Sequence, residues 1–471
     1  MDYRCQRISH WDSVARESDN RPPTGRAYHD RLATIYGHLV APKLRVLEVG
    51  CGRGDLLAAL APARGVGVDF SGEMIQRAKR RHPELTFVQQ DAEEVRLDGT
   101  FDVIILSDLV NDLWDVQRVL EGLHPVCHPG TRIILNTYSR AWEFPLSMAE
   151  RLDLARPVLR QNWLTVPDME NLLALAGFET LRRFQEVLLP LGVPVIAPIC
   201  NRWLVKLWPF RHLALTNFLV ARPGLSPRAG NPPPRVSVIV PARNEAGNIS
   251  EIFERVPKLG SGTELIFVEG HSTDDTRSTI ERAIAARPES GARLLVQKGK
   301  GKGDAVRLGF AEASGDILMI LDADLTVAPE DLPRFVEAMA SGRGEFVNGV
   351  RLVYPMEERA MRSLNLLGNK FFSAAFSWLL GQRVKDTLCG TKVLWRHHYE
   401  TLAANRAYFG DFDPFGDFDL LFGAARQNLK IVDLPVRYGE RRYGTTNIQR
   451  FRHGLLLLRM VAFAARRLKF V

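Results

Sequence analysis

The fold of the second half of the chain is decided by the stretch Gly315-Asp-Ile-Leu-Met-Ile-Leu-Asp322-Ala-Asp324-Leu-Thr326. It reads as a buried apolar strand that delivers Asp322 and Asp324, two residues apart. Side chains with this spacing point to the same side of a strand, so both carboxylates can meet one divalent ion. Mg²⁺ or Mn²⁺ held this way keeps open ligand positions for a diphosphate, whose departure it assists by absorbing charge. Asp322 and Asp324 are therefore the predicted metal ligands and catalytic residues.

Neighbouring strands carry polar groups at the same edge. The apolar run 236–240 leads into Pro241-Ala-Arg-Asn-Glu245, and the run 264–268 ends at Glu269. Residues 298–304, Lys-Gly-Lys-Gly-Lys-Gly-Asp, form a flexible cationic loop that suits contact with phosphate, with a solvated turn as the alternative. Polar groups that gather where strands stop indicate a site at the carboxyl edge of a mainly parallel sheet.

The first half repeats the strand-to-helix pattern but with a glycine-rich turn. Residues 44–49 read as a short buried strand, followed by Gly50-Cys-Gly52-Arg-Gly54 and a helical pattern. The next strand, 65–68, ends at Asp69, whose carboxylate could accept both hydroxyl protons of a ribose. Two further strands, 85–88 and 101–106, lead to Asp91 and Ser107. Four successive strand ends thus carry polar groups.

Length and composition predict a globular protein with more than one domain. The 471 residues are 46% hydrophobic and 25% charged, which excludes collagen-like, low-complexity and disordered classes. Residues 222–235, rich in Pro and Gly, can hold neither a helix nor a central strand. We expect an α/β protein of two domains: residues 1–222, a Pro-rich linker at 223–234, and residues 235–471.

Charge and cysteine content narrow the compartment and the partners. The formal net charge of +8 suits anionic partners, from nucleotide diphosphates to acidic lipid headgroups or RNA. The 5 cysteines show no metal-ligand spacing, which suits a reducing compartment. The charged first 20 residues show no secretory signal, and nowhere do about 18 apolar residues run uninterrupted. We expect a cytoplasmic protein, in which residues 187–200 form core or touch a membrane surface.

The ordered motifs of the first half resemble class I S-adenosylmethionine-dependent methyltransferases, over residues 28 to 177. The likeness is carried by Glu48-Val-Gly-Cys-Gly-Arg-Gly54, Asp69-Phe-Ser, Gln90-Asp91-Ala and Phe101-Asp-Val. It implies a Rossmann-like fold with S-adenosylmethionine as cofactor. In that fold Gly50 and Gly52 would pass the methionine moiety, Asp69 would hold the ribose, Asp91 the adenine amino group, and Ser107 would line the floor. The cofactor-binding residues that the resemblance implies are Glu48, Gly50, Gly52, Asp69, Asp91 and Ser107.

An NAD-dependent enzyme is the alternative for this half, although its usual glycine spacing is absent. His10-Trp11-Asp12 lies where methyltransferases often place a lid over the cofactor, while packing is the plainer role for an isolated Trp. Alignment of the methyl group with a nucleophile can supply much of the rate, so no general base need be visible.

Five motifs of the second half, in order, resemble family-2 glycosyltransferases of the GT-A fold, especially the polyprenyl-phosphate sugar transferases. They are Pro241-Ala-Arg-Asn-Glu245, Gly301-Lys-Gly-Asp-Ala305, Leu321-Asp-Ala-Asp-Leu-Thr326, Asp386-Thr-Leu-Cys-Gly-Thr-Lys392 and Tyr443-Gly-Thr-Thr-Asn447. The resemblance implies inverting sugar transfer from a nucleotide-sugar, a UDP- or GDP-sugar, to a lipid-phosphate or glycan acceptor. The implied nucleotide-sugar-binding residues are Pro241, Ala242, Arg243, Glu245, Glu269, Lys302, Asp304 and Asp322.

Three residues near the end of the chain extend the predicted catalytic set. Asp417 and Asp419 stand where related enzymes position the acceptor and could take a hydroxyl proton, although Asp417 could equally be a helix N-cap. Arg441 could neutralise a diphosphate. Many relatives carry two aspartates where this chain has Glu269 and Gly270, which leaves the nucleoside open. A nucleotidyltransferase is the chemical alternative, but its early glycine-rich, Arg-containing loop is missing.

Two apolar segments suggest peripheral contact with the inner membrane face. Beyond residue 448, arginines recur every seven residues on an otherwise apolar helical pattern that could lie on a bilayer or cover the domain's own core. Residues 366–380 form a second apolar helical candidate. The favoured hypothesis is a bifunctional transferase, and the alternative is an active glycosyltransferase beside a methyltransferase-like domain that only binds cofactor or partners. A nucleic-acid protein is not expected, because no basic patch interleaved with aromatics is present.

Overall fold

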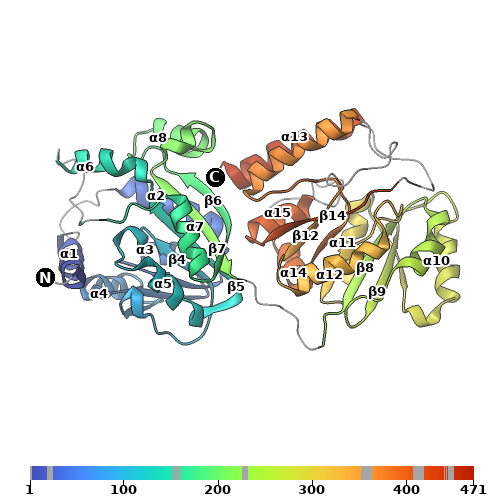
Figure 1. Ribbon diagram of the computed structural model, residues 1–471, viewed down its shortest axis with the longest axis horizontal. Coiled ribbons are helices and arrows are strands. Elements are labelled where there is room, and N and C mark those ends of the chain that lie inside the picture. Colours follow the sequence, from blue (N-terminus) through green and yellow to red (C-terminus); the bar gives the residue numbers. More distant parts are fainter. Residues whose placement is uncertain are drawn as a thin grey trace. The chain divides into compact units, whose positions relative to one another are not determined.

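The chain folds into two units of α/β architecture, which confirms the predicted fold class (Figure 1). The computed structural model describes residues 3–17, 25–151, 159, 161–224, 232–351, 363–406, 418–439, 441, 443 and 450–470, without the side chains of 363–367 and 450–453. The first unit comprises residues 1–224 together with residues 470–471, and the second runs from Leu225 to Lys469.

The first unit is built on a mixed sheet in the order β3-β2-β1-β4-β5-β7-β6. Its first five strands in that order are parallel, and β7 is antiparallel to both β5 and β6. The strands are β1 Arg45–Val49, β2 Arg64–Asp69, β3 Thr86–Gln89, β4 Phe101–Ser107, β5 Cys127–Tyr138, β6 Phe178–Glu186 and β7 Thr216–Pro223. The helices are α1 Tyr3–Glu17, α2 Arg26–Leu39, α3 Asp55–Ala59, α4 Gly72–Arg81, α5 Val116–Gly122, α6 Glu143–Arg151, α7 Val166–Leu175 and α8 Ile196–Pro198.

The second unit is built on a sheet in the order β10-β9-β8-β11-β13-β12-β14. Strands β10, β9, β8 and β11 are parallel, and β13 is antiparallel to both β11 and β12. The strands are β8 Val236–Ala242, β9 Thr263–Glu269, β10 Arg293–Val296, β11 Ile317–Ile320, β12 Phe346–Val350, β13 Lys392–Trp395 and β14 Ile431–Pro435. The helices are α9 Ile249–Arg255, α10 Thr276–Ala285, α11 Lys302–Glu312, α12 Leu332–Ala340, α13 Ser363–Leu380, α14 Arg396–Ala404, α15 Phe418–Arg426 and α16 Arg450–Ala464.

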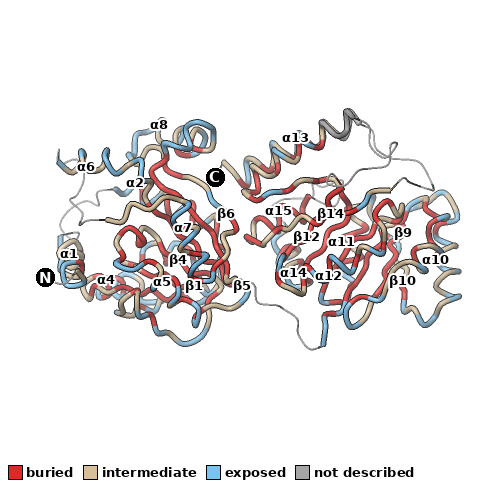
Figure 2. The backbone as a smooth tube through the Cα atoms, viewed as in Figure 1, coloured by how far each residue is buried: buried red, intermediate tan, exposed pale blue. Residues whose placement is uncertain are grey.

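Each central strand is buried on both faces, as the apolar runs in the sequence indicate. Along β1, Val46 packs into the core on one side of the sheet and Leu47 into the core on the other. In β8, Val238 and Ile239 likewise pack into the cores on opposite sides of the sheet. Figure 2 shows the strands of both units as mainly buried. Because strand side chains alternate, such runs fit strands that are covered by helices on both sides.

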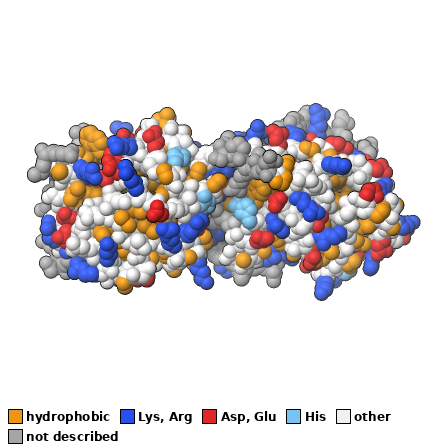
Figure 3. Space-filling view, turned by 90° about the horizontal axis from the view of Figure 1, so that it is seen from below, with side chains coloured by type: hydrophobic (Ala, Val, Ile, Leu, Met, Phe, Trp, Pro, Cys, Tyr) orange, Lys and Arg blue, Asp and Glu red, His pale blue; other side chains and the backbone are white. Residues whose placement is uncertain are grey.

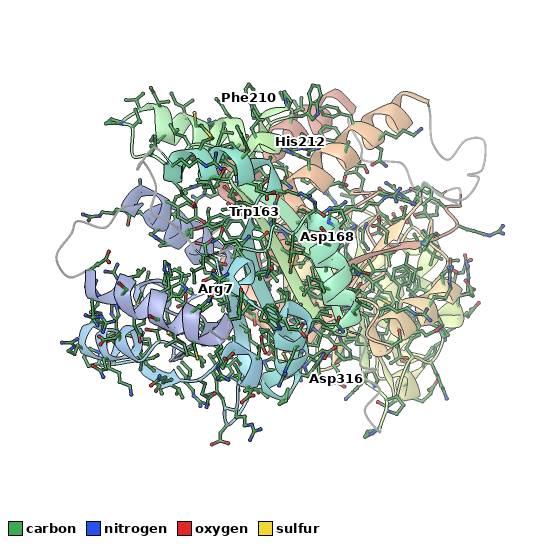
Figure 4. All side chains as sticks on the ribbon, turned by 60° about the vertical axis from the view of Figure 1, so that its left-hand side comes forward. Arg7, Trp163, Asp168, Phe210, His212 and Asp316 are labelled. Carbon is green, nitrogen blue, oxygen red and sulfur yellow. The ribbon has the colours of Figure 1, made fainter. Side chains whose placement is uncertain are left out.

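Local sequence signals explain where several helices begin. Ser71 accepts a hydrogen bond from the backbone N–H of Met74 and so caps α4. A capping box opens α7, where Thr165 and Asp168 each accept a hydrogen bond from the other's backbone N–H; Asp168 is labelled in Figure 4. These caps satisfy N–H groups that a helix leaves without a partner inside its first turn.

The apolar segments of the second unit serve its own core in part. Leu457, Met460 and Ala464 of α16 are at most 4% exposed and pack in one cluster with Phe376 of α13. Leu455, on the same helix, is 55% exposed. The helix therefore covers the core with one face and keeps an exposed apolar side chain on another. No helix in the described part of the chain is long and apolar enough to cross a membrane.

Candidate active sites

The glycine-rich turn after β1 lies where the order of strands reverses in the first sheet. Gly50 and Gly52 adopt φ angles of 76° and 51°, which other residues rarely take. A Cβ at Gly50 would lie 2.8 Å from Cδ1 of Leu109, whereas a Cβ at Gly52 would meet nothing within 4 Å. The backbone at Gly52 therefore has open space beside it at the edge where ligands bind in open α/β sheets.

Asp69, at the end of β2, holds this turn in place. Its Oδ2 accepts a hydrogen bond from the backbone N–H of Gly52 at 2.9 Å, and its Oδ1 accepts one from the N–H of Ser71 at 2.9 Å. Burial raises the pKa of Asp69 to about 6. Each carboxylate oxygen has two lone pairs, so both keep acceptor capacity beyond these backbone contacts. Asp69 is thus a structural clamp with capacity left for a ligand hydroxyl.

Glu48 contributes a buried carboxyl group to the same edge. It is 3% exposed, and burial raises its pKa to about 8. Its Oε2 finds no hydrogen-bond partner among the residues that the structure describes. An orphaned buried carboxyl oxygen is costly, so this atom fits a site that is completed by a ligand or by water. The nearby Ser107 ends β4 and is partly buried.

Helix α1 is fastened to the loops at this edge. Arg4 Nε lies 2.7 Å from Asp91 Oδ2, and Trp11 Nε1 donates to Asp112 Oδ2 at 2.6 Å. Arg7, labelled in Figure 4, also pairs with Asp112. Trp11 therefore connects α1 to the loop after β4. The sequence gives no signal for Arg4, Arg7 or Asp112, because their contacts join segments about 100 residues apart.

A buried polar network stands beside Ser107. Asp108 adopts a φ of 53°, and its Oδ1 accepts a hydrogen bond from the Tyr28 hydroxyl at 2.8 Å and another from the amide of Asn136. The Tyr36 hydroxyl donates to Asn136 Oδ1 at 2.7 Å. Burial raises the pKa of Asp108. Sequence reasoning assigns Asp108 no role, since its partners come from α2 and β5. A positive φ outside glycine marks a position that its surroundings hold in place.

In the second unit, the ends of β8 and β9 lie side by side. Ala242 pairs with Glu269 in the register of the two strands. Glu269 is 4% exposed, and its Oε1 accepts a hydrogen bond from the N–H of Ser272. Pro241 belongs to β8, and Arg243, just beyond the strand, is exposed. The predicted nucleoside-side residues therefore meet at one edge of the sheet.

Strand β11 ends at Ile320, so Asp322 and Asp324 lie in the loop beyond it and not on the strand as expected. Lys302 Nζ, in the first turn of α11, is 2.6 Å from Asp322 Oδ1. Gly390 lies against this pair: a Cβ there would come 2.6 Å from Asp322 Cγ, and closer still to its Oδ2 and to Lys302 Nζ. A glycine is therefore required for the ion pair to keep its place.

Arg441 bridges two carboxylates of the predicted site. Its Nη1 is 2.9 Å from Glu245 Oε1, and its Nη2 is 2.7 Å from Asp324 Oδ2. Burial raises the pKa of Glu245 to about 7, although the Arg441 charge acts in the opposite direction. The hydroxyl of Thr326 donates to Asp324 Oδ1 at 2.8 Å. The structure thus brings Asp322, Asp324, Glu245, Lys302 and Arg441 to one edge of the second sheet.

The remaining predicted residues have varied surroundings. Asp304 Oδ2 accepts a hydrogen bond from the N–H of Gly299 at 2.9 Å, which stabilises the cationic loop. Asp419 lies in the first turn of α15, 3.6 Å from Arg406 Nε. Asp417 lies outside the described residues. No group of three or more His, Cys, Asp or Glu side chains in the described part of the chain forms a ready metal site.

A buried ion pair lies in the segment just before Gly390 and holds it to Arg351. Asp386 is 0% exposed, and Arg351 donates to it from Nε at 2.7 Å and from Nη2 at 2.9 Å. Burial alone would raise the pKa of Asp386, but the Arg351 charge outweighs it and holds that pKa at about 2. The motif around Asp386 is visible in the sequence, whereas its partner Arg351 is not.

Comparisons with known proteins divide the chain as its two sheets do. A methyltransferase domain model matches residues 41–174, and the model of glycosyl transferase family 2 matches residues 237–402. Glycosyltransferase AglJ of Haloferax volcanii is 28% identical over 224 residues, covering 47% of this chain and 69% of that protein. The undecaprenyl-phosphate 4-deoxy-4-formamido-L-arabinose transferase of Klebsiella pneumoniae is 27% identical over 217 residues, covering 45% of this chain and 62% of that protein.

The aligned part spans about two thirds of the length of these relatives. Among solved structures, glucosyl-3-phosphoglycerate synthase from Mycobacterium tuberculosis has a TM-score of 0.37 and 23% identity, covering 50% of this chain and 80% of that one. The two family models match separate parts of one polypeptide. The chain thus combines a methyltransferase-like domain with a domain that matches glycosyl transferase family 2, which supports its classification as a transferase.

Proposed function

We propose that the second unit transfers a sugar from a UDP- or GDP-sugar to a lipid-phosphate or glycan acceptor, with the help of a divalent metal ion. The observation that carries this proposal is the cluster of Asp322, Asp324, Lys302 and Arg441 at one sheet edge. Carboxylates and cations together suit a metal diphosphate, because one set binds the metal and the other binds phosphate oxygens. The names of the bacterial relatives, which specify an undecaprenyl-phosphate acceptor, support the lipid-phosphate class.

Asp322 and Asp324 fit a divalent cation by the chemistry of their donors. Both present hard carboxylate oxygens, and their side chains keep 27% and 14% exposure. Mg²⁺ or Mn²⁺ bound there would neutralise charge that develops on the leaving diphosphate. Lys302 and Arg441, which now pair with these carboxylates, would bind diphosphate oxygens, and Glu269 and Arg243 would contact the nucleoside. If the acceptor is a phosphate, it is already anionic and needs no base; if it is a hydroxyl, Asp419 or Asp417 would take the proton.

We infer that the first unit binds S-adenosylmethionine and transfers its methyl group. The orphaned Oε2 of Glu48 and the open space beside Gly52 support a ligand at this edge. Asp69 would accept the ribose hydroxyls, Asp91 the adenine amino group, and Ser107 would line the floor. The protein would act in the cytoplasm, at the inner membrane face, and without nucleic acid as a partner.

A second candidate is an active glycosyltransferase whose first unit binds cofactor or partners without catalysis. One contact favours a first unit that binds partners in place of cofactor: Arg4 occupies Oδ2 of Asp91, the carboxylate expected to hold adenine. If Arg4 competes with the cofactor, Arg4→Ala should tighten S-adenosylmethionine binding about two- to fivefold, the worth of an exposed ion pair. Unchanged or weaker binding would mean that Arg4 does not compete.

The glycosyltransferase proposal is tested by donor turnover. Purified protein is incubated with UDP- and GDP-sugars and Mg²⁺ or Mn²⁺, and release of the nucleotide is followed with and without polyprenyl phosphate. Asp324→Asn should abolish metal-dependent turnover, whereas Asp331→Asn, which changes a carboxylate in a partly exposed pair with Arg334, should leave it unchanged. Wild-type turnover by Asp324→Asn would remove Asp324 from the mechanism.

The methyltransferase proposal is tested by calorimetric titration with S-adenosylmethionine. Asp69→Ala should weaken binding at least about tenfold, because the turn loses its clamp and the ribose its acceptor. Asp98→Ala, on an exposed loop of the same unit, is the matched control. Equal affinity of the Asp69 variant and the wild type would contradict the assignment.

A further inference from the structure

The connection between β6 and β7, residues 187–215, exposes an unusual amount of apolar surface. Its large apolar side chains range from 37% exposed at Val193 to 74% exposed at Trp208. Figure 2 shows this part, around α8, as mostly exposed, and Figure 4 labels Phe210 on it. We call these ten side chains the apolar edge: Leu191, Val193, Val195, Ile196, Ile199, Trp203, Leu207, Trp208, Phe210 and Leu213.

The segment that carries the apolar edge is fixed from inside. Asn201 is 8% exposed; its Oδ1 accepts hydrogen bonds from the N–H groups of Leu188 and Leu189 at 2.7 and 2.8 Å. Arg31 of α2 donates to the carbonyl of Asn201 at 3.0 Å, and Trp142 Nε1 donates to the carbonyl of Leu213 at 2.9 Å. The apolar side chains therefore project from an anchored scaffold.

Strand pairing places the apolar edge beside the candidate cofactor site. Thr216, the first residue of β7, pairs with Tyr138 at the end of β5 and with Glu186 at the end of β6. Strand β5 is parallel to β4, which ends at Ser107. Residues 187–215 thus leave the sheet at the same carboxyl edge as Ser107 and Asp69.

The charges of this segment have one sign. The sequence contains no Asp or Glu between Glu186 and Glu245, while residues 187–213 contain Arg202, Lys206 and Arg211. Lys206 and Arg31 both pair with the buried Glu186, so this trio retains one positive charge. By contrast, the face drawn in Figure 3 mixes Lys and Arg with Asp and Glu.

We propose that the apolar edge docks the first unit onto the surface of a bilayer that contains anionic lipid. Apolar side chains with flanking arginines suit the boundary between headgroups and acyl chains, where Trp is enriched. The cavity nearby, about 630 Å³, is lined by residues of α6 and by Trp163, and none of its lining residues belongs to the apolar edge. Two of its lining residues are Glu143 and Glu150, opposite in sign to Arg140 beside them.

The inference rests on the proposed function, since docking at this edge would turn the cofactor residues toward a lipid-borne methyl acceptor. It goes beyond that function because it identifies which surface meets the bilayer. That surface belongs to the first unit, whereas the sequence suggested a membrane contact for the segment that forms α16 of the second unit. Scattered exposed apolar residues are common, whereas ten between Leu191 and Leu213 on one anchored connection indicate an interaction site.

The test is flotation of the full-length protein with vesicles of phosphatidylcholine alone or with about 30% phosphatidylglycerol. We expect the protein to bind only to the anionic vesicles. High salt should weaken this binding, because it screens the attraction between the basic side chains and the anionic lipid. The double variant Ile196→Ser/Trp208→Ser should lower the bound fraction about fivefold or more, since it removes two of the most exposed anchors. Leu175→Ser, 59% exposed on α7 of the same unit, is the matched control and should bind as wild type.

Further measurements separate the outcomes. S-adenosylmethionine binding by the double variant in solution should equal that of the wild type. If neither the wild type nor the variants bind S-adenosylmethionine, the proposed function is contradicted, and flotation alone then decides whether the apolar edge docks on a bilayer. Wild-type protein that stays unbound from anionic vesicles would overturn the inference. So would flotation abolished by Leu455→Ser/Leu458→Ser on α16 but retained by the double variant. A dimer in sedimentation that the double variant disrupts, without vesicle binding, would assign the apolar edge to a second copy instead.

Discussion

Replacement of Asp386 by Asn tests whether the buried ion pair between Asp386 and Arg351 stabilises the second unit. The Asp386 carboxylate is 0% exposed and accepts hydrogen bonds from Arg351 Nε, Arg351 Nη2 and Asn369 Nδ2, and also from the N–H groups of Arg351 and Leu388. Asn has nearly the same shape but leaves the Arg351 charge buried without a counter-ion. Breaking a buried pair from one side costs about 3–5 kcal/mol.

That free energy should be visible as a large thermal shift. In a unit of 150–250 residues, each kcal/mol corresponds to about 2–4 °C, so Asp386→Asn should lower the Tm of the second unit by about 6–20 °C. Pulse proteolysis along a temperature ramp, with mass spectrometry of the fragments, tells which unit unfolds. The matched control is Asp331→Asn, whose partner Arg334 is 45% exposed; this surface pair should contribute less than about 1 kcal/mol. Equal shifts for the two variants would refute the reasoning.

The same pair gives a test in acid. The pKa of Asp386 is lowered to about 2 in the folded protein, whereas an unfolded Asp titrates near about 4. A depressed folded pKa means that the stabilisation is complete above the unfolded pKa and is lost as the pH falls toward 2. Asp386→Asn should therefore lose less stability than the wild type between pH about 5 and 2. Parallel acid profiles would show that this carboxylate is not responsible.

Two further predictions concern the sites themselves. Gly390→Ala should abolish nucleotide-sugar turnover while the protein stays folded, because the added Cβ would displace the flexible ends of Lys302 and Asp322. Donor hydrolysis measures the turnover, and circular dichroism shows whether the variant is folded. Gly262→Ala, where a Cβ meets nothing within 4 Å, is the control and should keep wild-type turnover. Burial raises the pKa of Asp69 to about 6, so its carboxyl is mostly protonated at pH 5 and has then lost an acceptor oxygen. S-adenosylmethionine should therefore bind about tenfold more weakly at pH 5 than at pH 7.5, as measured by calorimetry. Asp69→Asn should remove this pH dependence.

The strands that carry the sites could be predicted from sequence because their signals are local. The run 236–240 is apolar and ends in turn residues, and the structure extends it by two residues as β8, to Ala242. For β11 the apolar pattern continues to Leu321, yet the strand ends at Ile320. The loop beyond it folds on itself, with Leu325 at a φ of 53° and Asp324 bonded to the N–H of Thr326. Such a turn depends on backbone angles that strand periodicity does not report.

The contacts within the sites depend on distant segments. Arg441 lies 196 residues from Glu245 in the chain, and Arg7 lies 105 residues from Asp112. A motif names which residue types gather at a strand end, but it does not say which cation reaches which carboxylate. Likewise, from the sequence alone residues 187–200 could be either core or a membrane contact. Their exposure is evident only once the sheet edge that carries them is known.

The two candidate sites hold their carboxylates in physically different ways, and this predicts different responses to ligand. Asp69 is bonded to two backbone N–H groups, of Gly52 and Ser71, so its position is set by the turn and by the start of α4. Asp322 and Asp324 are paired with Lys302 and Arg441, whose charged groups sit on long rotatable side chains. A cofactor at the first edge would find its acceptor already in place, whereas a metal diphosphate at the second must exchange each cation from carboxylate to phosphate. Hydrogen exchange should therefore change little near Gly52 when S-adenosylmethionine binds, and more in the first turn of α11 when a nucleotide-sugar and Mg²⁺ bind.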